Sequence, residues 1–353
     1  MKGIILHGGH GTRLRPLTHT GPKQLLPIAN KPMSEYCVET LANAGIKEIA
    51  FIVGGIGSKK VKEYYGDGEK FGVKFTYIQQ DSPKGIAHAV SLCEDFVNNE
   101  KFIVFLGDNI IQREINGYIL DFEKSNASAS LLLCEVNNPS QFGIAEIENE
   151  KIIKITEKPK NPPTNLAVTG IYFLTPYIFE VIKKLKPSWR NELEIADALQ
   201  ILVEENKKII YGMITDFWKD TGTPNDIIEA NKIILENMLE SFEGKKEDNV
   251  VMEGKIMIGE GTVIKNDVKI FGPVIIGKNC VIEGDTIIGE NTSINDNCHL
   301  NNCKISDSII MSSCRIDGKL DIKNSIIASN SKIIKEEKSE KKFILGEGTQ
   351  ISL

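Results

Sequence analysis

The stretch KGIILHGGHGTRL, residues 2–14, joins a short apolar run to a glycine-rich loop. The run Lys2–Leu6 predicts a buried strand. Glycine brings no side chain to a core, but it lets backbone amides approach a ligand and allows positive φ; the loop glycines are Gly8, Gly9 and Gly11. Amides in such a loop are suited to holding phosphate, helped by the polar and cationic side chains of Thr12, Arg13, Arg15 and Lys23. An ordinary tight turn between a strand and a helix is the alternative.

Two familiar phosphate-binding loops are excluded by this stretch. The dinucleotide fingerprint requires a third glycine at the position of Leu14. The Walker loop requires Gly-Lys-Ser/Thr, which the segment lacks.

The chain as far as residue 110 predicts an α/β fold. Apolar strand patterns alternate with helical spacing, with strands expected at 49–53, 73–78 and 102–106 and helices at 33–44, 59–65 and 86–96. This alternation is typical of a doubly wound, mostly parallel sheet, in which ligands bind beyond the carboxyl ends of the strands.

Polar residues follow these strands at the expected binding edge. Gln80 comes directly after one strand and could offer its amide to a base, or it could be a solvated loop residue. Asp108 follows the strand 102–106 closely and predicts either a metal ligand or a turn residue. Its place on the same edge as the glycine loop favours the metal ligand. Asp220 lies in the tight turn WKDTGTP, residues 218–224, before a helix expected to run to about residue 240.

The segment 131–156 predicts short strands with a hairpin around Asn149-Glu150. Glu157-Lys158-Pro159 then reads, taken alone, as a salt-bridged surface corner. Arg190–Asp197 is expected to open an amphipathic helix, in which Glu194 and Asp197 would be first-turn acids favoured by the helix dipole.

A six-residue period dominates the C-terminal third. Aliphatic residues recur at 258, 264, 270, 276, 282, 288, 294 and 300, and the period returns more loosely at 310, 316 and 322. Neither a helix nor a flat sheet has this period, which indicates a parallel β-helix. We therefore expect an α/β domain at 1–240, a polar linker at 241–250 and a β-helix at 251–353. The charged run 335–342 is interpreted as a loop extruded from a coil.

Composition limits the classes of function. A net charge of −6 without a basic tail argues against nucleic-acid binding. The apolar N-terminal run is too short for a signal peptide or a membrane span. Seven scattered cysteines without a Cys-x-x-Cys motif are expected to be reduced in a cytoplasmic protein.

The N-terminal segment resembles the opening motifs of the sugar-1-phosphate nucleotidylyltransferases at residues 8–18, 22–27 and 30–33. The local amino-acid sequence is most similar to that of the long-chain glucose-1-phosphate thymidylyltransferases. The resemblance implies a Rossmann-like nucleotidyltransferase domain followed by a left-handed β-helix. It implies Mg²⁺ held by Asp108 and Asp220, and Arg13 and Lys23 as the catalytic cations. Nucleotide-binding residues are then expected to be Gly8, Gly9, Gly11, Thr12, Arg13, Lys23, Gln24, Gln80, Gly85 and Asp108. Sugar-phosphate-binding residues are expected to be Asn109, Gly143, Glu157, Lys158, Val168, Gly170, Tyr172, Arg190 and Trp218.

The expected reaction joins dTTP and α-D-glucose 1-phosphate to give dTDP-glucose and pyrophosphate. A UTP-dependent enzyme is an alternative, because Gln80 could read either pyrimidine. A non-catalytic regulatory subunit would share the two-domain plan, and a sugar acyltransferase would need a base such as His299, the only histidine after residue 88. A homo-oligomer with contacts through the β-helix is also expected.

Overall fold

The computed structural model describes residues 1–9, 11–55 and 57–335. Two compact units are formed. The first comprises residues 1–11, 18–25 and 33–220, and the second comprises 12–17, 26–32 and the chain from 221 onward.

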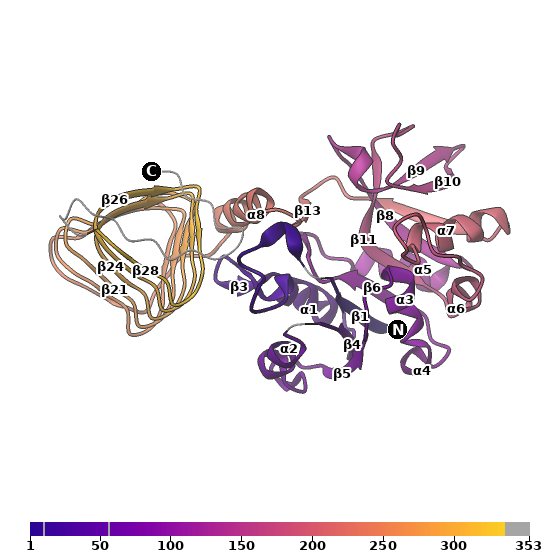
Figure 1. Cartoon of the computed structure of the whole chain (residues 1–353), viewed down its shortest axis with the longest axis horizontal. Helices are drawn as coiled ribbons and strands as arrows, with labels where there is room; N and C mark the ends of the chain where they lie inside the picture. Colours follow the sequence, from indigo (N-terminus) through magenta and orange to yellow (C-terminus); the bar gives the residue numbers. More distant parts are fainter. Residues whose placement is uncertain (10, 56, 336–353) are drawn as a thin grey trace. The chain divides into compact units, whose positions relative to one another are not determined.

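A nine-stranded sheet forms the centre of the first unit. Parallel pairs join β5 (Lys74–Gln79), β4 (Glu48–Val53), β1 (Lys2–His7) and β6 (Phe102–Leu106), and Figure 1 shows these strands side by side. The strands expected from the apolar runs are thus confirmed. The sheet continues from β6 through antiparallel β11 (Leu166–Leu174), to which β8 (Ala129–Glu135) and β9 (Gly143–Glu148) pair, and it ends in β10 (Lys151–Glu157) and β12 (Ile209–Met213).

Helices cover both faces of this sheet. Ile4 and Leu6 of β1 pack toward the cluster that includes α3 (Ile86–Ser91), α4 (Glu94–Val97), α6 (Tyr177–Ile182) and α7 (Ile195–Glu204). Ile5 between them packs toward the cluster with α1 (Met33–Asn43), α2 (Ser58–Tyr65) and α5 (Asn116–Lys124). Alternation along one buried strand therefore produces the doubly wound arrangement.

The hairpin expected around residues 149–150 is confirmed. β9 and β10 pair antiparallel, and Asn149 and Glu150 have φ of 49° and 61° at the turn between them. Two consecutive left-handed residues are the geometry that closes a two-residue hairpin with the normal strand twist.

The second unit contains a β-helix of parallel strands, stacked beside one another in Figure 1. Ile258 pairs with Ile276 and Ile276 with Ile294, so one coil takes 18 residues, or three six-residue repeats. The ladder continues from Ile294 to Ile310, a shorter step of 16 residues, which explains why the period loosens after residue 300. The aliphatic positions predicted from the period are buried from Ile258 to Ile316 and half-buried at Ile322, in agreement with the left-handed β-helix expected from the sequence.

The strands of the β-helix are short. They are β14 (Ser241–Phe242), β15 (Lys245–Lys246), β16 (Val251–Glu253), β17 (Ile256–Ile258), β18 (Val263–Ile264), β19 (Lys269–Phe271), β20 (Val274–Ile276), β21 (Val281–Glu283), β22 (Ile287–Ile288), β23 (Thr292–Ile294), β24 (His299–Ser306), β25 (Ile309–Ile310), β26 (Arg315–Lys323), β27 (Ile326–Ile327) and β28 (Lys332–Ile334). β14 pairs with β17, and β15 pairs with β18. The segment 241–250, expected to be a linker, thus includes strands of the β-helix. The predicted boundary between catalytic domain and β-helix stays a prediction, and the run 336–342 lies outside the described residues.

A buried asparagine joins three segments of this second unit. α8 (Pro224–Glu236) begins at a capping box formed by Thr223 and Asp226, and its Asn231 is fully buried. Asn231 Oδ1 accepts hydrogen bonds from the Ala29 amide and the Ser293 hydroxyl, both at 2.8 Å, while Nδ2 donates to the Asn291 carbonyl at 3.1 Å. The hairpin of β2 (Pro27–Ile28) and β3 (Lys31–Pro32) is thereby fastened to α8 and to a coil of the β-helix.

Candidate active site

The carboxyl ends of β1, β5 and β6 bring their following loops together. A Cβ at Gly8 would lie 3.1 Å from Gln80 Oε1, so the glycine loop passes directly beside this glutamine. The buried Gln24 donates from Nε2 to the Gly8 carbonyl at 3.0 Å. The Gly107 amide donates to the Leu6 carbonyl at 3.0 Å, which places Asp108 at the same edge.

The shape of the loop requires glycine at two of its positions. Gly9 and Gly11 have φ of 97° and 57°. A Cβ at Gly11 would lie 2.9 Å from Thr18 Cγ2, and the Thr18 hydroxyl donates to the Gly11 carbonyl at 2.8 Å. The loop is therefore folded tightly over Thr18, and its glycines serve conformation as well as close approach.

Lys23 and Asp108 form an ion pair at this edge. Burial alone would raise the pKa of Asp108, but the charge and hydrogen bond of Lys23, together with hydrogen bonds from Asn109 and the backbone, hold it below its usual range. His7 lies nearby and is buried against Phe51, with ring centroids 5.0 Å apart, and burial lowers its pKa to about 3. The imidazole is thus a neutral core group, and the positive charge beside Asp108 comes from Lys23.

The second predicted carboxylate lies close to the first. β13 (Trp218–Asp220) pairs with β7 (Asn109–Ile111), and Asp220 stands opposite Asn109, the neighbour of Asp108. Burial raises the pKa of the Tyr172 hydroxyl, and the charges of Glu157, Asp108 and Asp220 raise it further, so all three carboxylates lie within electrostatic reach of one ring. Oxygen ligands from two carboxylates fit Mg²⁺, which usually completes its coordination with water and phosphate oxygens. Among residues 1–9, 11–55 and 57–335, no group of three or more acidic, histidine or cysteine side chains forms a metal site from protein alone.

Asn109 connects residues that are far apart in the sequence. Its Oδ1 accepts hydrogen bonds from Trp218 Nε1 at 2.8 Å and from the Gly170 amide at 3.1 Å, and its Nδ2 donates to Asp108 Oδ1 at 3.0 Å. A Cβ at Gly170 would lie 2.7 Å from Asn109 Cγ, so only glycine leaves room for this amide. Asn109 therefore fixes the position of Asp108 relative to β11 and β13.

Several residues expected to bind the sugar phosphate lie close to one another in β9, β10 and β11. Gly143 pairs with Glu157 across β9 and β10, and a Cβ at Gly143 would lie 3.3 Å from Glu157 Oε2 and 4.0 Å from Val168 Cβ. Lys158 has φ of 42° and reaches Glu157 Oε1 at 3.7 Å. Phe142 packs edge-on against Trp218, with the ring centroids 5.4 Å apart.

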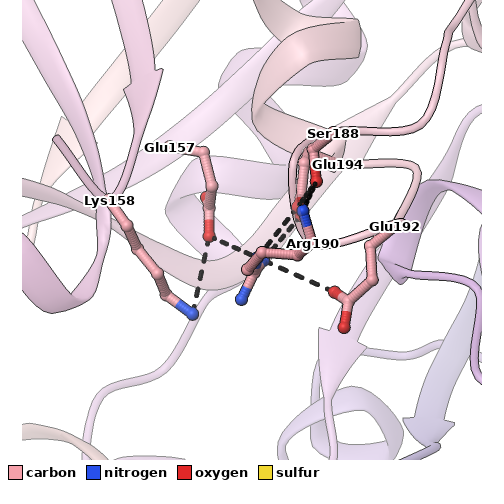
Figure 2. Close-up of polar contacts among 6 residues, drawn as sticks. All are labelled: Glu157, Lys158, Ser188, Arg190, Glu192 and Glu194. Carbon is pink, nitrogen blue, oxygen red and sulfur yellow. Dashed lines mark hydrogen bonds and ion pairs between the residues drawn. The ribbon is translucent and has the colours of Figure 1, made fainter.

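Arg190 lies outside the helix in which the sequence placed it. α7 begins at Ile195, and residues 188–192 form a turn in which the Asn191 amide donates to the Ser188 carbonyl at 2.8 Å. Figure 2 shows the Arg190 guanidinium among the carboxylates of Glu157, Glu192 and Glu194. The sequence did not predict that Glu192 and Glu194 pair with Arg190. It assigned Glu194 to the helix dipole, whereas its carboxylate pairs with Arg190.

The loop after β5 is joined to the Arg190 turn through Leu193. The Leu193 amide donates to the Lys84 carbonyl at 2.8 Å, and the Ala87 amide donates to the Leu193 carbonyl at 3.0 Å. Gly85 has φ of 99°, and a Cβ there would lie 2.4 Å from the Leu193 carbonyl oxygen. Glycine is therefore required where these two loops meet.

Thr12 and Arg13 belong to the second unit, in the short 3-10 turn Thr12–Leu14. Within that unit a Cβ at Gly222 would lie 3.1 Å from Arg13 Nη2. The guanidinium thus lies against the chain two residues after Asp220. Its expected role at the triphosphate stays a prediction.

Residues 2–237 match the protein family described as Nucleotidyl transferase. The chain belongs to this family. Residues 270–352 match the family described as GMPPB C-terminal domain. With its Rossmann-like domain and its β-helix, this nucleotidyl transferase has the two-domain fold expected from the sequence.

Relatives of this nucleotidyl transferase extend over its full length. The low-salt glycan biosynthesis nucleotidyltransferase Agl11 of Haloferax volcanii is 40% identical, with 100% of both chains covered. A glucose-1-phosphate thymidylyltransferase of Streptomyces antibioticus is 38% identical, covering 100% of this chain and 99% of the relative. A solved UDP-glucose pyrophosphorylase complexed with UDP-glucose is 29% identical with a TM-score of 0.61, covering 67% of this chain and 99% of the other. The protein is thus a nucleotidyltransferase of the sugar-1-phosphate type.

No helix in the described part of the chain is both long and apolar enough to cross a membrane.

Proposed function

We propose that the protein is a glucose-1-phosphate thymidylyltransferase that converts dTTP and α-D-glucose 1-phosphate to dTDP-glucose and pyrophosphate, with Mg²⁺ held by Asp108 and Asp220. The main support is the arrangement at the strand ends. Lys23, Asp108 and the strand carrying Asp220 meet at the edge where Gln80 touches the glycine loop. The full-length relative of the same named activity supports the choice of substrates.

The reaction forms a bond between a phosphate oxygen of the sugar phosphate and the α-phosphorus of the nucleotide, and it breaks the bond from that phosphorus to the departing pyrophosphate. The attacking oxygen is already ionised near neutral pH, so no protein base has to remove a proton. The main obstacles are repulsion between two polyanions and the entropy of aligning them. Lys23 would neutralise the nucleotide, while Lys158 and Arg190 would hold the sugar phosphate in line. Bound Mg²⁺ would supply further charge neutralisation at the α-phosphate.

Gln80 would read a thymine or uracil. Its Nε2 lies 2.9 Å from His88 Nδ1, and its Oε1 faces the glycine loop. An acceptor in that direction pairs with the N3–H of thymine or uracil, whereas cytosine has an unprotonated N3 there. This contact favours both pyrimidine triphosphates equally, so UTP remains the alternative nucleotide.

A pyrophosphate-release screen tests the proposal. dTTP, UTP, CTP and ATP are each combined with glucose 1-phosphate, N-acetylglucosamine 1-phosphate, galactose 1-phosphate and mannose 1-phosphate in the presence of Mg²⁺. We expect the highest kcat/KM for dTTP with glucose 1-phosphate, and no turnover when EDTA replaces Mg²⁺. A higher kcat/KM for UTP would make the protein a uridylyltransferase, and no turnover with any pair would refute the proposal.

Gly170→Ala is expected to lower kcat/KM for the sugar phosphate roughly 10–100-fold, the range seen when a supporting contact is displaced. The new methyl group would push Asn109 away from Trp218 and Asp108, since no space exists for it. Gly117→Ala is the matched control, because a Cβ at that helical glycine meets nothing within 4 Å. Steady-state kinetics with both substrates would check the result. Equal kinetics for the two variants would remove Asn109 from the site.

The acyltransferase alternative has one structural feature in its favour. His299 Nε2 lies 2.6 Å from Glu283 Oε1 on the β-helix, and a carboxylate can hold a histidine in the orientation of a general base. Glu283 also pairs with Lys265, so the three residues form a polar row across neighbouring coils of the β-helix. Release of coenzyme A from acetyl-coenzyme A with a sugar or nucleotide-sugar acceptor would show such an activity. The pyrophosphate-release screen also tests the regulatory-subunit alternative, because a non-catalytic subunit would give no turnover with any substrate pair.

Self-association through the β-helix and a cytoplasmic location are also proposed. Light scattering of the full chain, compared with the mass of 39.2 kDa for one chain, gives the number of subunits.

A further inference from the structure

Of the three carboxylates around Arg190, that of Glu194 makes two contacts with the guanidinium, and the other two make one each. Nε donates to Glu194 Oε1 at 3.0 Å, and Nη2 donates to Glu194 Oε2 at 2.8 Å. Glu157 and Glu192 each reach only Nη2, at 3.3 and 3.4 Å. A two-point contact fixes the plane of the guanidinium, while a single contact at one corner does not. Figure 2 shows this difference between Glu194 and Glu192.

Glu194 is itself fixed in place. Its side chain is 4% exposed, and the Ser188 hydroxyl donates to its Oε1 at 2.7 Å. The preceding residue, Leu193, is bonded through its amide and its carbonyl to Lys84 and Ala87. A buried carboxylate anchored in this way gives Arg190 a fixed position relative to the loop of Gly85.

Glu192 differs from Glu194 in burial and in support. Its side chain is 38% exposed, and its one side-chain partner among the described residues is Arg190. Three carboxylates pair with Arg190 or Lys158, and Asp197 lies within electrostatic reach of the same group, so its carboxylates outnumber its cations. A phosphate entering here must replace an anion, and the exposed, singly held Glu192 is the one that leaves at the lowest free-energy cost.

We propose that Glu194 is a positioning residue for sugar-phosphate binding: it holds the inner edge of the Arg190 guanidinium, while Glu192 occupies the place that the incoming phosphate takes. Among the described residues, Nη1 of Arg190 makes no hydrogen bond, so it can donate to the phosphate once Glu194 has set its direction. The inference rests on the proposed function, because it assumes that Arg190 binds the phosphate of the sugar.

The two glutamates are expected to respond in opposite directions to the same substitution. Glu194→Gln keeps the shape but loses the charge that orients Arg190, so the KM for the sugar 1-phosphate rises about tenfold, with the KM for the nucleotide unchanged. Glu192→Gln removes a competing anion, so the KM for the sugar 1-phosphate falls several-fold. Glu180→Gln, an exposed glutamate of α6 paired with Lys183, is the control and is expected to match the native protein.

A double-mutant cycle separates positioning from a merely structural role. In an Arg190→Lys background, Glu194→Gln is expected to have little further effect on the sugar-phosphate KM, because Lys cannot form the two-point contact. Additive effects, a rise in both KM values together, or the same response from both glutamates would overturn the inference. If Glu194→Gln fails to fold, Ser188→Ala removes one hydrogen bond to the same carboxylate and should raise the same KM by a smaller factor.

Failure of the proposed function can be told apart from failure of this inference. The native protein is first tested for pyrophosphate release, and no turnover with any substrate pair refutes the function alone. Calorimetric titration with inorganic phosphate then tests Arg190 directly. Weaker phosphate binding by Glu194→Gln and tighter binding by Glu192→Gln support the inference, while equal binding by both variants and the native protein overturns it.

Discussion

Replacing Asp108 with asparagine is expected to lower kcat at least 10²–10³-fold, the loss typical when a charged group that stabilises the transition state is removed. Asparagine has nearly the same shape, but it cannot supply the negative charge that Asp108 presents at the carboxyl end of β6. Lys23 would lose its partner, and Mg²⁺ would lose one of two proposed ligands. Pyrophosphate release under saturating Mg²⁺ measures the effect. Activity within tenfold of the native protein would contradict the metal assignment.

The same substitution has a predictable effect on stability. The pKa of Asp108 lies below its usual range, so its ionised form stabilises the folded protein at neutral pH. That contribution is present above the pKa of the unfolded chain and is lost as the pH falls through the lowered pKa of the folded state. Because the side chains of Lys23 and Asp108 remain 13% and 15% exposed, we expect Asp108→Asn to cost about 1–3 kcal/mol at pH 7. Denaturant unfolding gives this value, with Asp121→Asn in α5 as an exposed control.

Lys23→Ala is expected to lower kcat/KM for the nucleotide roughly 10–100-fold, since a charge-assisted hydrogen bond contributes about 1.5–3 kcal/mol. The KM for the sugar 1-phosphate should change much less, because Lys158 and Arg190 are assigned to that substrate. Lys59→Ala provides the control, since this lysine is exposed and pairs with Glu63 within α2. Steady-state kinetics with each substrate varied in turn would measure the split. An unchanged nucleotide kcat/KM would remove Lys23 from the site.

Hydrophobic patterning predicted the parts of the fold in which strands are enclosed on both faces or coils repeat regularly. The strands before Gly8 and Asp108 are continuous apolar runs, and the ladder from Ile258 to Ile294 repeats without a break. By contrast, Lys245 and Lys246 are exposed, and they lie in a strand without any ladder aliphatic. Their place in the β-helix depends on pairing with Val263 and Ile264, which no local pattern reveals.

The candidate site was predictable as a set of positions, but its contacts were not. Gln80 and Asp108 could be placed because each follows a parallel strand, and such strands end at one edge. The role of Glu194 could not, because it depends on the turn that carries Arg190 back toward the start of α7. The link from Asn109 to Trp218 likewise joins residues 109 positions apart, with no periodic signal between them.

The junction at Asn231 has a consequence for shortening the protein. A chain ended at residue 240 would lose Ser293 and the Asn291 carbonyl, exposing the Asn231 side chain, which is now buried and hydrogen-bonded through both its oxygen and its nitrogen. It would also strip the hairpin at 26–32 of its contact with the Ile294 carbonyl through Asn30. The repeat region thus helps to keep the segment following the glycine loop in shape, and cutting the coils away is expected to loosen that segment.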